Sequence, residues 1–385
     1  MNVYADNAAT TAMSRTAIEA MLPFLDRNYG NPSSPHRMGR RAAAALQQAR
    51  ERVARCLGAQ PGEIYFCSGG SEADNWALLS AAEAGAQAGK RHILSTAIEH
   101  PAVLRPLEAL RERGFEIELL PVNGDGFVTE RQVSDALRGD TCLVSVMYAN
   151  NEIGTIQPIP AIGALCRERG VPFHTDAVQA AGQLPIDVHA QNIDLLSLSA
   201  HKFHGPKGVG ALYARRGVPL VSWIRGGGQE RGRRAGTENL PAIAGMAAAL
   251  EEACLGMEEN TARLTALREE LIGRLSALPG SRLNGGRTGR LAGNVNFCFD
   301  GADGESLLIL LDRQGVCAGS GSACSSGAIE PSHVLRAIGR TPEQARTALR
   351  LSLCAWNTRE ETEYIAAVVE SAVARLRDGR REARP

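Results

Sequence analysis

Three short segments carry side chains that could act together on a small molecule. The segment "FCSGGSEADN" (66–75) has a Gly-Gly turn before a predicted helix, whose free backbone N–H groups and positive dipole end suit a phosphate. The segment "FHTDAVQAAG" (173–182) places Asp176 at the end of an apolar run, where a carboxylate needs backbone donors or a cation. The segment "LLSLSAHKFHGPKG" (195–208) ends an apolar run with Lys202, which could form a Schiff base if desolvation lowered its pKa.

Each segment alone also has a plain structural explanation. Ser71 could simply cap a helix, Asp176 could sit in an ordinary ion pair, and a lysine after a strand is usually solvated. The combination is more specific, because a phosphate cradle, a carboxylate and a lysine on successive strand ends are the groups that bind pyridoxal 5′-phosphate. Lys202 would take the aldehyde and Asp176 the protonated ring nitrogen.

A fourth segment, "GVCAGSGSACSSG" (315–327), surrounds Cys324 with glycine and serine. Such neighbours can neither pack a core nor hold a rigid element, so the run predicts a mobile loop. A thiol carried on this loop is either incidental or placed to reach a reacting group.

The elements that must position these residues follow a regular alternation from about residue 60 to 215. Short apolar runs alternate with helical patterns, which predicts a mostly parallel sheet covered by helices. Ligands of such sheets bind beyond the carboxyl ends of the strands. The predicted strands are "EIYFCSGG", "HILSTAI", "FEIELLPV", "TCLVSVMYA", "PFHTDAV", "LLSLSAH" and "GVGALYARR". A long alanine-rich helical stretch from about 240 to 278 then forms a bridge to a smaller α+β domain.

Composition narrows the classes of partner. The 385 residues contain 42 Lys and Arg and 42 Asp and Glu, so no net charge favours nucleic acid or an anionic membrane. The N-terminus lacks a leader pattern, and no run of about 18 apolar residues could span a bilayer, so a cytoplasmic protein is expected. Nine scattered cysteines without a CxxC pair argue against a disulfide framework and a zinc site.

The cofactor segments above are accompanied by the motifs "YADNAATT", "GNPSSPH", "EHPAVL", "YANNEIGTIQP", "GGGQERGRRAGTEN" and "SGSACSSGAIEPSHVLRA". With these motifs the chain resembles the cysteine desulfurases of the NifS/IscS type, in the class V aminotransferase group of fold-type I pyridoxal-phosphate enzymes. The resemblance covers about residues 3–375, and the motif wording leans toward the nitrogen-fixation type, NifS. It implies a large cofactor-binding α/β domain (15–255) and a small α+β domain (1–14 and 256–385).

The resemblance assigns roles around the cofactor ring. Lys202 would bind the aldehyde covalently, Asp176 would pair with the ring nitrogen, and Gln179 and Asn151 would lie near the phenolic oxygen. His100 would stack on the ring and shuttle a proton, a role that fits a side chain titrating near neutrality.

Further residues are assigned to the phosphate and the substrate. The phosphate positions match Gly70, Ser71, Ser199 and His201, with Ser71 standing where relatives more often have threonine. Thr237 would reach the phosphate of a neighbouring subunit, which implies a homodimer with shared active sites. Arg350 would bind the substrate carboxylate, assisted by Asn31. Cys354 and Ala355 depart from the pattern, which puts a secondary anion contact there in doubt.

Cys324 matches the desulfurase nucleophile. The implied reaction converts L-cysteine to L-alanine and leaves a persulfide on Cys324, which passes sulfur to an iron–sulfur scaffold protein, nitrogenase clusters being one destination. The alternatives are a selenocysteine lyase or a β-lyase that releases sulfide, and a scaffold that has lost its chemistry. The sequence does not specify the sulfur acceptor.

Overall fold

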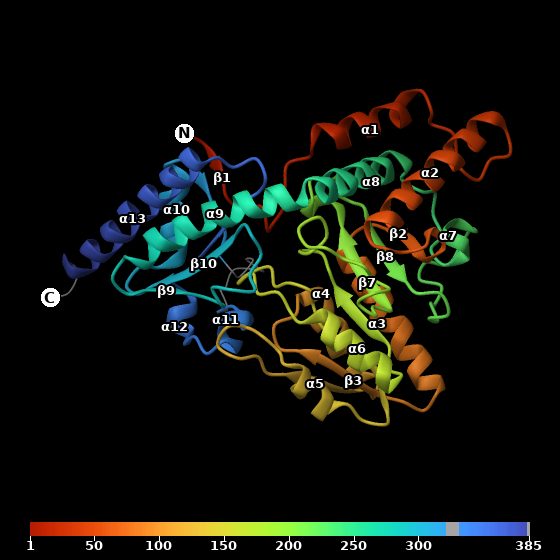
Figure 1. Cartoon of the computed structure of the whole chain (residues 1–385), viewed down its shortest axis with the longest axis horizontal. Helices are drawn as coiled ribbons and strands as arrows, with labels where there is room; N and C mark the ends of the chain where they lie inside the picture. Colours follow the sequence, from red (N-terminus) through yellow and green to blue (C-terminus); the bar gives the residue numbers. More distant parts are fainter. Residues whose placement is uncertain (321–330, 383–385) are drawn as a thin grey trace.

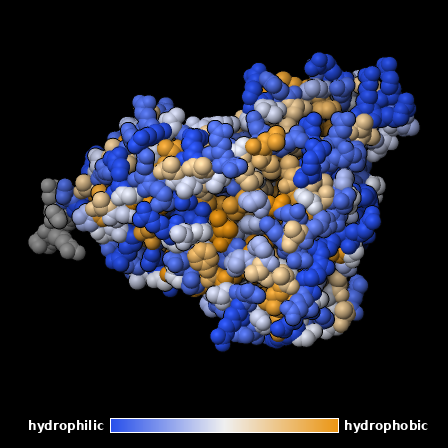
Figure 2. Space-filling view, viewed as in Figure 1, coloured by the Kyte–Doolittle hydropathy of each residue, from blue (hydrophilic) through white to orange (hydrophobic). Residues whose placement is uncertain are grey.

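The computed structural model describes residues 1–320 and 331–382, and it forms two lobes joined by a pair of helices (Figure 1). The larger lobe is built on a seven-stranded sheet and the smaller one on a three-stranded sheet. Figure 2 shows apolar residues gathered on the surface where the two lobes meet.

The seven predicted strands are the seven strands of the large sheet, so the predicted fold class is confirmed. Their spatial order is β2-β8-β7-β6-β5-β3-β4, with β8 antiparallel to both of its neighbours and the other pairs parallel. Strands β3, β5, β6, β7 and β8 are buried along their whole length, as expected for a sheet covered on both faces. The strands are β2 (Ile64–Cys67), β3 (His92–Thr96), β4 (Glu116–Leu120), β5 (Thr141–Ser145), β6 (Phe173–Asp176), β7 (Leu195–Ser199) and β8 (Gly210–Ala214).

Two apolar clusters lie on opposite faces of this sheet. One cluster joins α3 and α4 to strand residues that point to one face of the sheet, such as Ile93, Leu143 and Leu195. The other joins α2, α6 and α8 to the alternate positions, such as Leu94, Val144 and Leu196, because successive side chains of a strand point to opposite faces. The helices of the large lobe are α1 (Arg15–Asp26), α2 (Arg37–Cys56), α3 (Gly70–Gln87), α4 (Pro101–Glu112), α5 (Glu130–Ala136), α6 (Ile159–Arg169), α7 (Gln229–Gly232) and α8 (Leu240–Leu255), with short 3-10 turns at Pro61–Glu63 and Ala200–Lys202.

The small lobe packs helices α9, α10 and α13 against an antiparallel sheet of order β12-β10-β9. The chain's first residues belong to this lobe, since β1 pairs in parallel with β11 and Asp6 forms a bridge with Ser352. Its elements are β1 (Val3–Tyr4), α9 (Met257–Ser276), β9 (Ser281–Leu283), β10 (Asn294–Phe299), α10 (Gly304–Arg313), β11 (Val316–Cys317), α11 (His333–Ala337), α12 (Pro342–Ala345), β12 (Ala348–Ser352) and α13 (Arg359–Glu382).

The helical stretch expected from about 240 to 278 is not one helix. It breaks into α8 and α9, which bend by 70° at Gly256, a residue with low helix propensity. The bend coincides with the predicted domain boundary after residue 255, and the boundary itself stays a prediction. Within the described residues no single helix is long and apolar enough to cross a membrane; only the bent α8–α9 pair, taken together, meets those limits of length and composition.

One buried ion pair ties α7, in the segment that follows β8, to α2. Arg50 on α2 donates two hydrogen bonds to the Glu230 carboxylate, at 2.8 and 2.7 Å, and the two side chains are only 8% and 2% exposed. Glu230 also accepts from the backbone N–H of Phe66 at 3.0 Å, although its own φ of 45° is unfavourable for a side-chain-bearing residue.

We therefore expect Arg50→Ala to lower the free energy of unfolding by about 3–5 kcal/mol, because it leaves the Glu230 charge buried without its partner. The control is Arg15→Ala, which breaks the exposed Arg15–Glu19 pair (82% and 59% exposed) and should cost less than about 1 kcal/mol. Chemical denaturation measures both; equal losses in the two variants would contradict the assignment.

Candidate active site

A cavity of about 230 Å³ opens at the carboxyl ends of β6 and β7, where a parallel sheet of this kind binds its ligands. It collects side chains from five separate parts of the chain. Nine of the thirteen predicted site residues line it: Gly70, Ser71, His100, Asn151, Asp176, Gln179, Ser199, His201 and Lys202. The cavity has four further lining residues that no sequence pattern singled out, Asp74, Met147, Ala149 and Val178.

Lys202 occupies the short 3-10 turn that directly follows β7. Its ammonium donates to the carbonyl oxygens of Ala8 and Ala9, at 2.6 and 2.8 Å. Desolvation, aided by the positive charge of Arg350, lowers the pKa of Lys202 to about 8. A neutral amine is therefore available near neutral pH, as an amine that must attack an aldehyde requires.

Asp176 ends β6 and is buried beneath the cavity. One carboxylate oxygen accepts the backbone N–H of Val178 at 2.9 Å. Burial, followed by the nearby Asp74 carboxylate, raises the pKa of Asp176 to about 7. A cation placed against this carboxylate would offset the cost of burying its charge, which is what a protonated ring nitrogen supplies.

A polar network lies under Asp176. The ring nitrogens of His174 are within hydrogen-bond distance of the Ser145 and Ser197 hydroxyls, at 2.8 and 3.1 Å. Burial lowers the pKa of His174 to about 4, so this imidazole is neutral. The Asp74 carboxyl lies 3.6 Å from His174, and burial raises its pKa to about 7.

The N-terminus of α3 forms the anion-binding side of the cavity. The helix begins at Gly70, and its N-cap residue, Gly69, supplies no side-chain cap, so the first backbone N–H groups remain available to a ligand. A Cβ on Gly70 would lie 2.5 Å from Val178, which explains the glycine. Ser199 and His201 stand nearby on the strand end, and burial lowers the pKa of His201 to about 4.

These three features, a desolvated lysine, a buried carboxylate and an uncapped helix N-terminus, fit pyridoxal 5′-phosphate. Lys202 would hold the aldehyde carbon, Asp176 the ring nitrogen, and the first turn of α3 the phosphate. Gln179 is fixed by a hydrogen bond from its amide to the Ala8 carbonyl at 2.9 Å. His100 caps α4 through the backbone N–H of Ala102, and its pKa is lowered by partial desolvation.

Arg350 adjoins this cavity from β12 of the small lobe. Its Nη1 donates to the Asn151 carbonyl at 3.1 Å, and its Nη2 donates to Asp6 at 2.7 Å. Asp6 lies in the "YADNAATT" motif, and no role was predicted for it. The structure therefore brings Arg350 to the cavity wall through Asn151.

Three predicted site residues are not brought together with the others in the described part of this chain. Asn31 lies in the loop between α1 and α2, where its side chain accepts the N–H of Ser33. Thr237 is exposed in the segment that Arg234 anchors to Glu72. Cys324 lies outside the described residues. The roles assigned to all three stay predictions.

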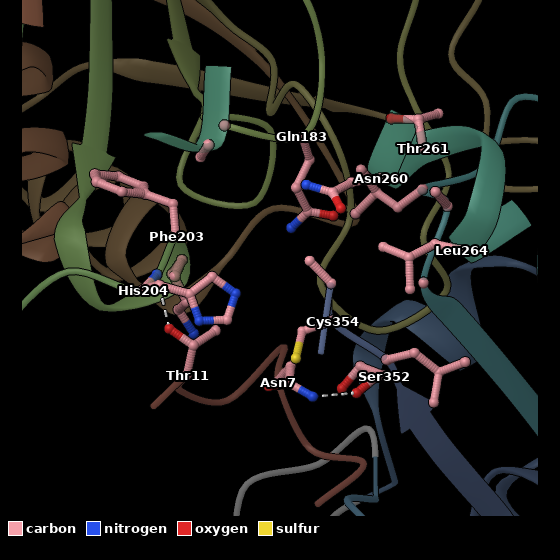
Figure 3. A pocket seen from close by; sticks show the side chains of 18 of the residues that line it. Asn7, Thr11, Gln183, Phe203, His204, Asn260, Thr261, Leu264, Ser352 and Cys354 are labelled. Atoms are coloured by element: carbon pink, nitrogen blue, oxygen red, sulfur yellow. Dashed lines mark hydrogen bonds between the residues drawn. The ribbon is translucent and has the colours of Figure 1, made fainter. Parts of the chain in front are cut away.

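A second cavity, of about 310 Å³, lies between the lobes and shares Lys202 and Gln179 with the first (Figure 3). Hydrogen bonds from Asn7 to the Ser352 carbonyl (2.8 Å) and from the His204 N–H to Thr11 (2.9 Å) mark its wall. Cys354 faces this cavity and is half-buried.

The family model described as Aminotransferase class-V matches residues 3–365. The chain belongs to the class-V aminotransferase family. It is 50% identical over 376 residues to a protein of Methanosarcina thermophila named Cysteine desulfurase IscS, covering 98% of this chain and 93% of that one. It is also similar to a solved structure titled NIFS-LIKE PROTEIN, with a TM-score of 0.91, 39% identity and coverage of 97% and 100%.

A third similar protein is a solved structure titled "SspA in complex with cysteine", with a TM-score of 0.81, 37% identity and coverage of 92% and 99%. Together these findings confirm the predicted family. Class-V aminotransferases of this kind depend on pyridoxal 5′-phosphate, so the predicted cofactor is confirmed as well.

The low pKa of Lys202 predicts how this protein reacts with its cofactor. The chain has three lysines, so Lys90 and Lys207 serve as internal controls. When cofactor-free protein is mixed with pyridoxal 5′-phosphate and reduced with borohydride, labelling of Lys202 should rise through about pH 8, below the range near 10.4 of an ordinary lysine. Peptide mass mapping measures each site; a Lys202 curve that coincides with that of exposed Lys207 would contradict the assignment.

Proposed function

We propose that this class-V aminotransferase is a cysteine desulfurase that removes sulfur from L-cysteine for iron–sulfur cluster assembly. The observation that carries the proposal is the cavity that joins Lys202, Asp176 and the α3 N-terminus, with Arg350 against its wall. The names of the relatives support the same reaction, and the solved relative in complex with cysteine supports the substrate.

The chemistry divides between the cofactor and the chain. When bound, pyridoxal 5′-phosphate withdraws electrons from the carbon skeleton of the substrate. Arg350 binds the substrate carboxylate, because a planar guanidinium pairs two N–H groups with two oxygens. Lys202 and His100, whose pKa values both lie below their usual ranges, exchange protons with the substrate.

The sulfur is taken up by Cys324. Its thiolate attacks the substrate sulfur, so that an S–S bond forms while the C–S bond of L-cysteine breaks. The carbon that loses sulfur takes a proton, which leaves L-alanine and a persulfide on Cys324. The net change is one sulfur atom moved from L-cysteine to a protein thiol, from which a scaffold protein accepts it.

Replacing Cys324 tests this assignment. We expect Cys324→Ala to keep the bound cofactor. Its rate of alanine formation from L-cysteine should fall by about 10²-fold or more, because no thiolate is left to accept sulfur. The matched control is Cys317→Ala, an exposed cysteine of the same segment, which should stay active. Alanine and protein-bound persulfide are both measured; a Cys324→Ala variant with undiminished alanine formation and free sulfide would show a lyase instead.

We further propose that the protein works as a homodimer in which each subunit completes the other's site. Thr237 is exposed and lies outside the cavity that holds Lys202, yet Arg234, three residues before it, is anchored to the first turn of α3 by a 3.0 Å ion pair with Glu72. In this arrangement Thr237 contacts the phosphate of the partner's cofactor, and Asn31 assists at the substrate site.

Mixed dimers test the sharing. Lys202→Ala should abolish activity, and Thr237→Asp should weaken cofactor retention about tenfold or more, because a carboxylate repels the phosphate. If Thr237 serves the partner's site, refolding the two variants together should restore activity, since one of the two sites of each mixed dimer is then intact. Absence of restored activity in verified mixed dimers would place Thr237 in its own subunit's site.

A further inference from the structure

Two backbone segments pair with β12 at Arg350 and fix what surrounds its guanidinium. Gly319 faces it directly, because the two residues exchange a pair of backbone hydrogen bonds of 3.0 and 2.7 Å. Asp6 is held beside it by two backbone hydrogen bonds. The Ser352 N–H donates to the Ala5 carbonyl (2.7 Å), and the Asn7 N–H donates to the Ser352 carbonyl (3.2 Å). These backbone contacts fix the register of the segments, and the side chains of Asp6 and Arg350 are thereby brought together.

The guanidinium of Arg350 retains unused donors. An arginine has five N–H groups, and Arg350 spends one on the Asn151 carbonyl and one on Asp6. Its Nε is buried and has no hydrogen-bond partner in the described chain, although the side chain is only 8% exposed. A buried donor left without an acceptor is costly, so this atom indicates a ligand that supplies one.

The absence of a side chain at residue 319 leaves space beside the guanidinium of Arg350. A Cβ there would lie 2.7 Å from the Asp6 carboxylate, 2.9 Å from Nη2 and 3.4 Å from Nε of Arg350. Gly319 does not have a positive φ, so its backbone does not by itself require glycine. The space beside Arg350 is therefore the reason for the glycine.

We propose that Asp6 is a positioning residue for Arg350 and that Gly319 keeps open the face of the guanidinium on which the substrate carboxylate binds. The inference rests on the proposed function, which makes Arg350 the carboxylate-binding residue. Asp6 contacts Nη2 through a single oxygen and leaves Nε free, so a second carboxylate can bind the same guanidinium. Asp6 thus orients Arg350 as a hydrogen-bond acceptor rather than competing with the substrate.

The kinetic test compares Asp6→Ala with Asp6→Asn. Alanine removes the acceptor, so KM for L-cysteine should rise about tenfold with kcat changed less than about threefold. Asparagine keeps an oxygen at the same place and should stay within about threefold of the wild-type KM. A KM that falls in both variants would show that Asp6 competes with the substrate, and an unchanged KM in Asp6→Ala would show that it does not position Arg350; either result overturns the proposal.

Gly319→Ala tests the open face separately. Because its backbone tolerates alanine, the added methyl group should act only on its neighbours Asp6 and Arg350 and raise KM about tenfold or more. The control is Asp194→Ala. It removes a partly buried carboxylate that lies away from the cavity and pairs with Arg215 at a distance of 3.2 Å, so KM should stay unchanged. A wild-type KM in Gly319→Ala would refute the role of this glycine.

A binding measurement separates this inference from the proposed function. L-alanine and ethylamine, which lacks the carboxylate, are titrated into the pyridoxal-phosphate-loaded protein while the cofactor absorbance is followed. Asp6→Ala should weaken the binding of L-alanine about tenfold and leave the binding of ethylamine unchanged. Equal weakening of the binding of both compounds would show general damage and overturn the proposal. If wild type binds L-alanine in this way yet forms no alanine from L-cysteine, the desulfurase proposal fails while the role of Asp6 stands.

Discussion

A sheet with both faces covered has only its ends left for polar chemistry, and this constraint organises the large lobe. Strands β5, β6 and β7 are buried throughout, so the first positions where a charged group can meet a ligand are those at or just after their carboxyl ends. Asp176 and Lys202 occupy such positions on adjacent strands. Their unusual pKa values follow from the same burial that makes the sheet stable, since desolvation raises one and lowers the other.

The N-terminal residues 5–9 connect this sheet to the small lobe. The Ala8 carbonyl accepts hydrogen bonds from both Lys202 and Gln179, while Asp6 binds Arg350 of β12. The backbone of the same segment pairs with Ser352. A stretch of five residues therefore sets the placement of the cofactor lysine and of the carboxylate-binding arginine relative to each other, although these two residues come from different lobes and are 148 positions apart in the chain.

The buried groups beneath the cavity have a different role. His174, Ser145 and Ser197 satisfy one another, and Asp74 adds a second carboxyl near Asp176. Because two carboxyl groups this close disfavour a second negative charge, the proton they hold depends on whether a cation is bound above them. The polar network thus makes the cavity suited to a cationic ring against Asp176.

Much of the fold and of the candidate site could be predicted from the sequence, because local signals encode them. The seven apolar runs predicted seven strands, and the Gly-Gly turn and the residues after two runs predicted the groups that line the cavity. Other features depend on contacts between distant segments. No local pattern distinguishes Asp74 from a first-turn helix carboxylate, or Asp6 from a surface residue, because their roles arise only when α3 meets β6 and when residue 6 meets β12. The sequence by itself determined the alternation of elements and the chemical types at the strand ends, since periodicity and turn chemistry are local; only the tertiary structure decided which charges face one another, since desolvation and ion pairing depend on neighbours that the chain brings in from afar.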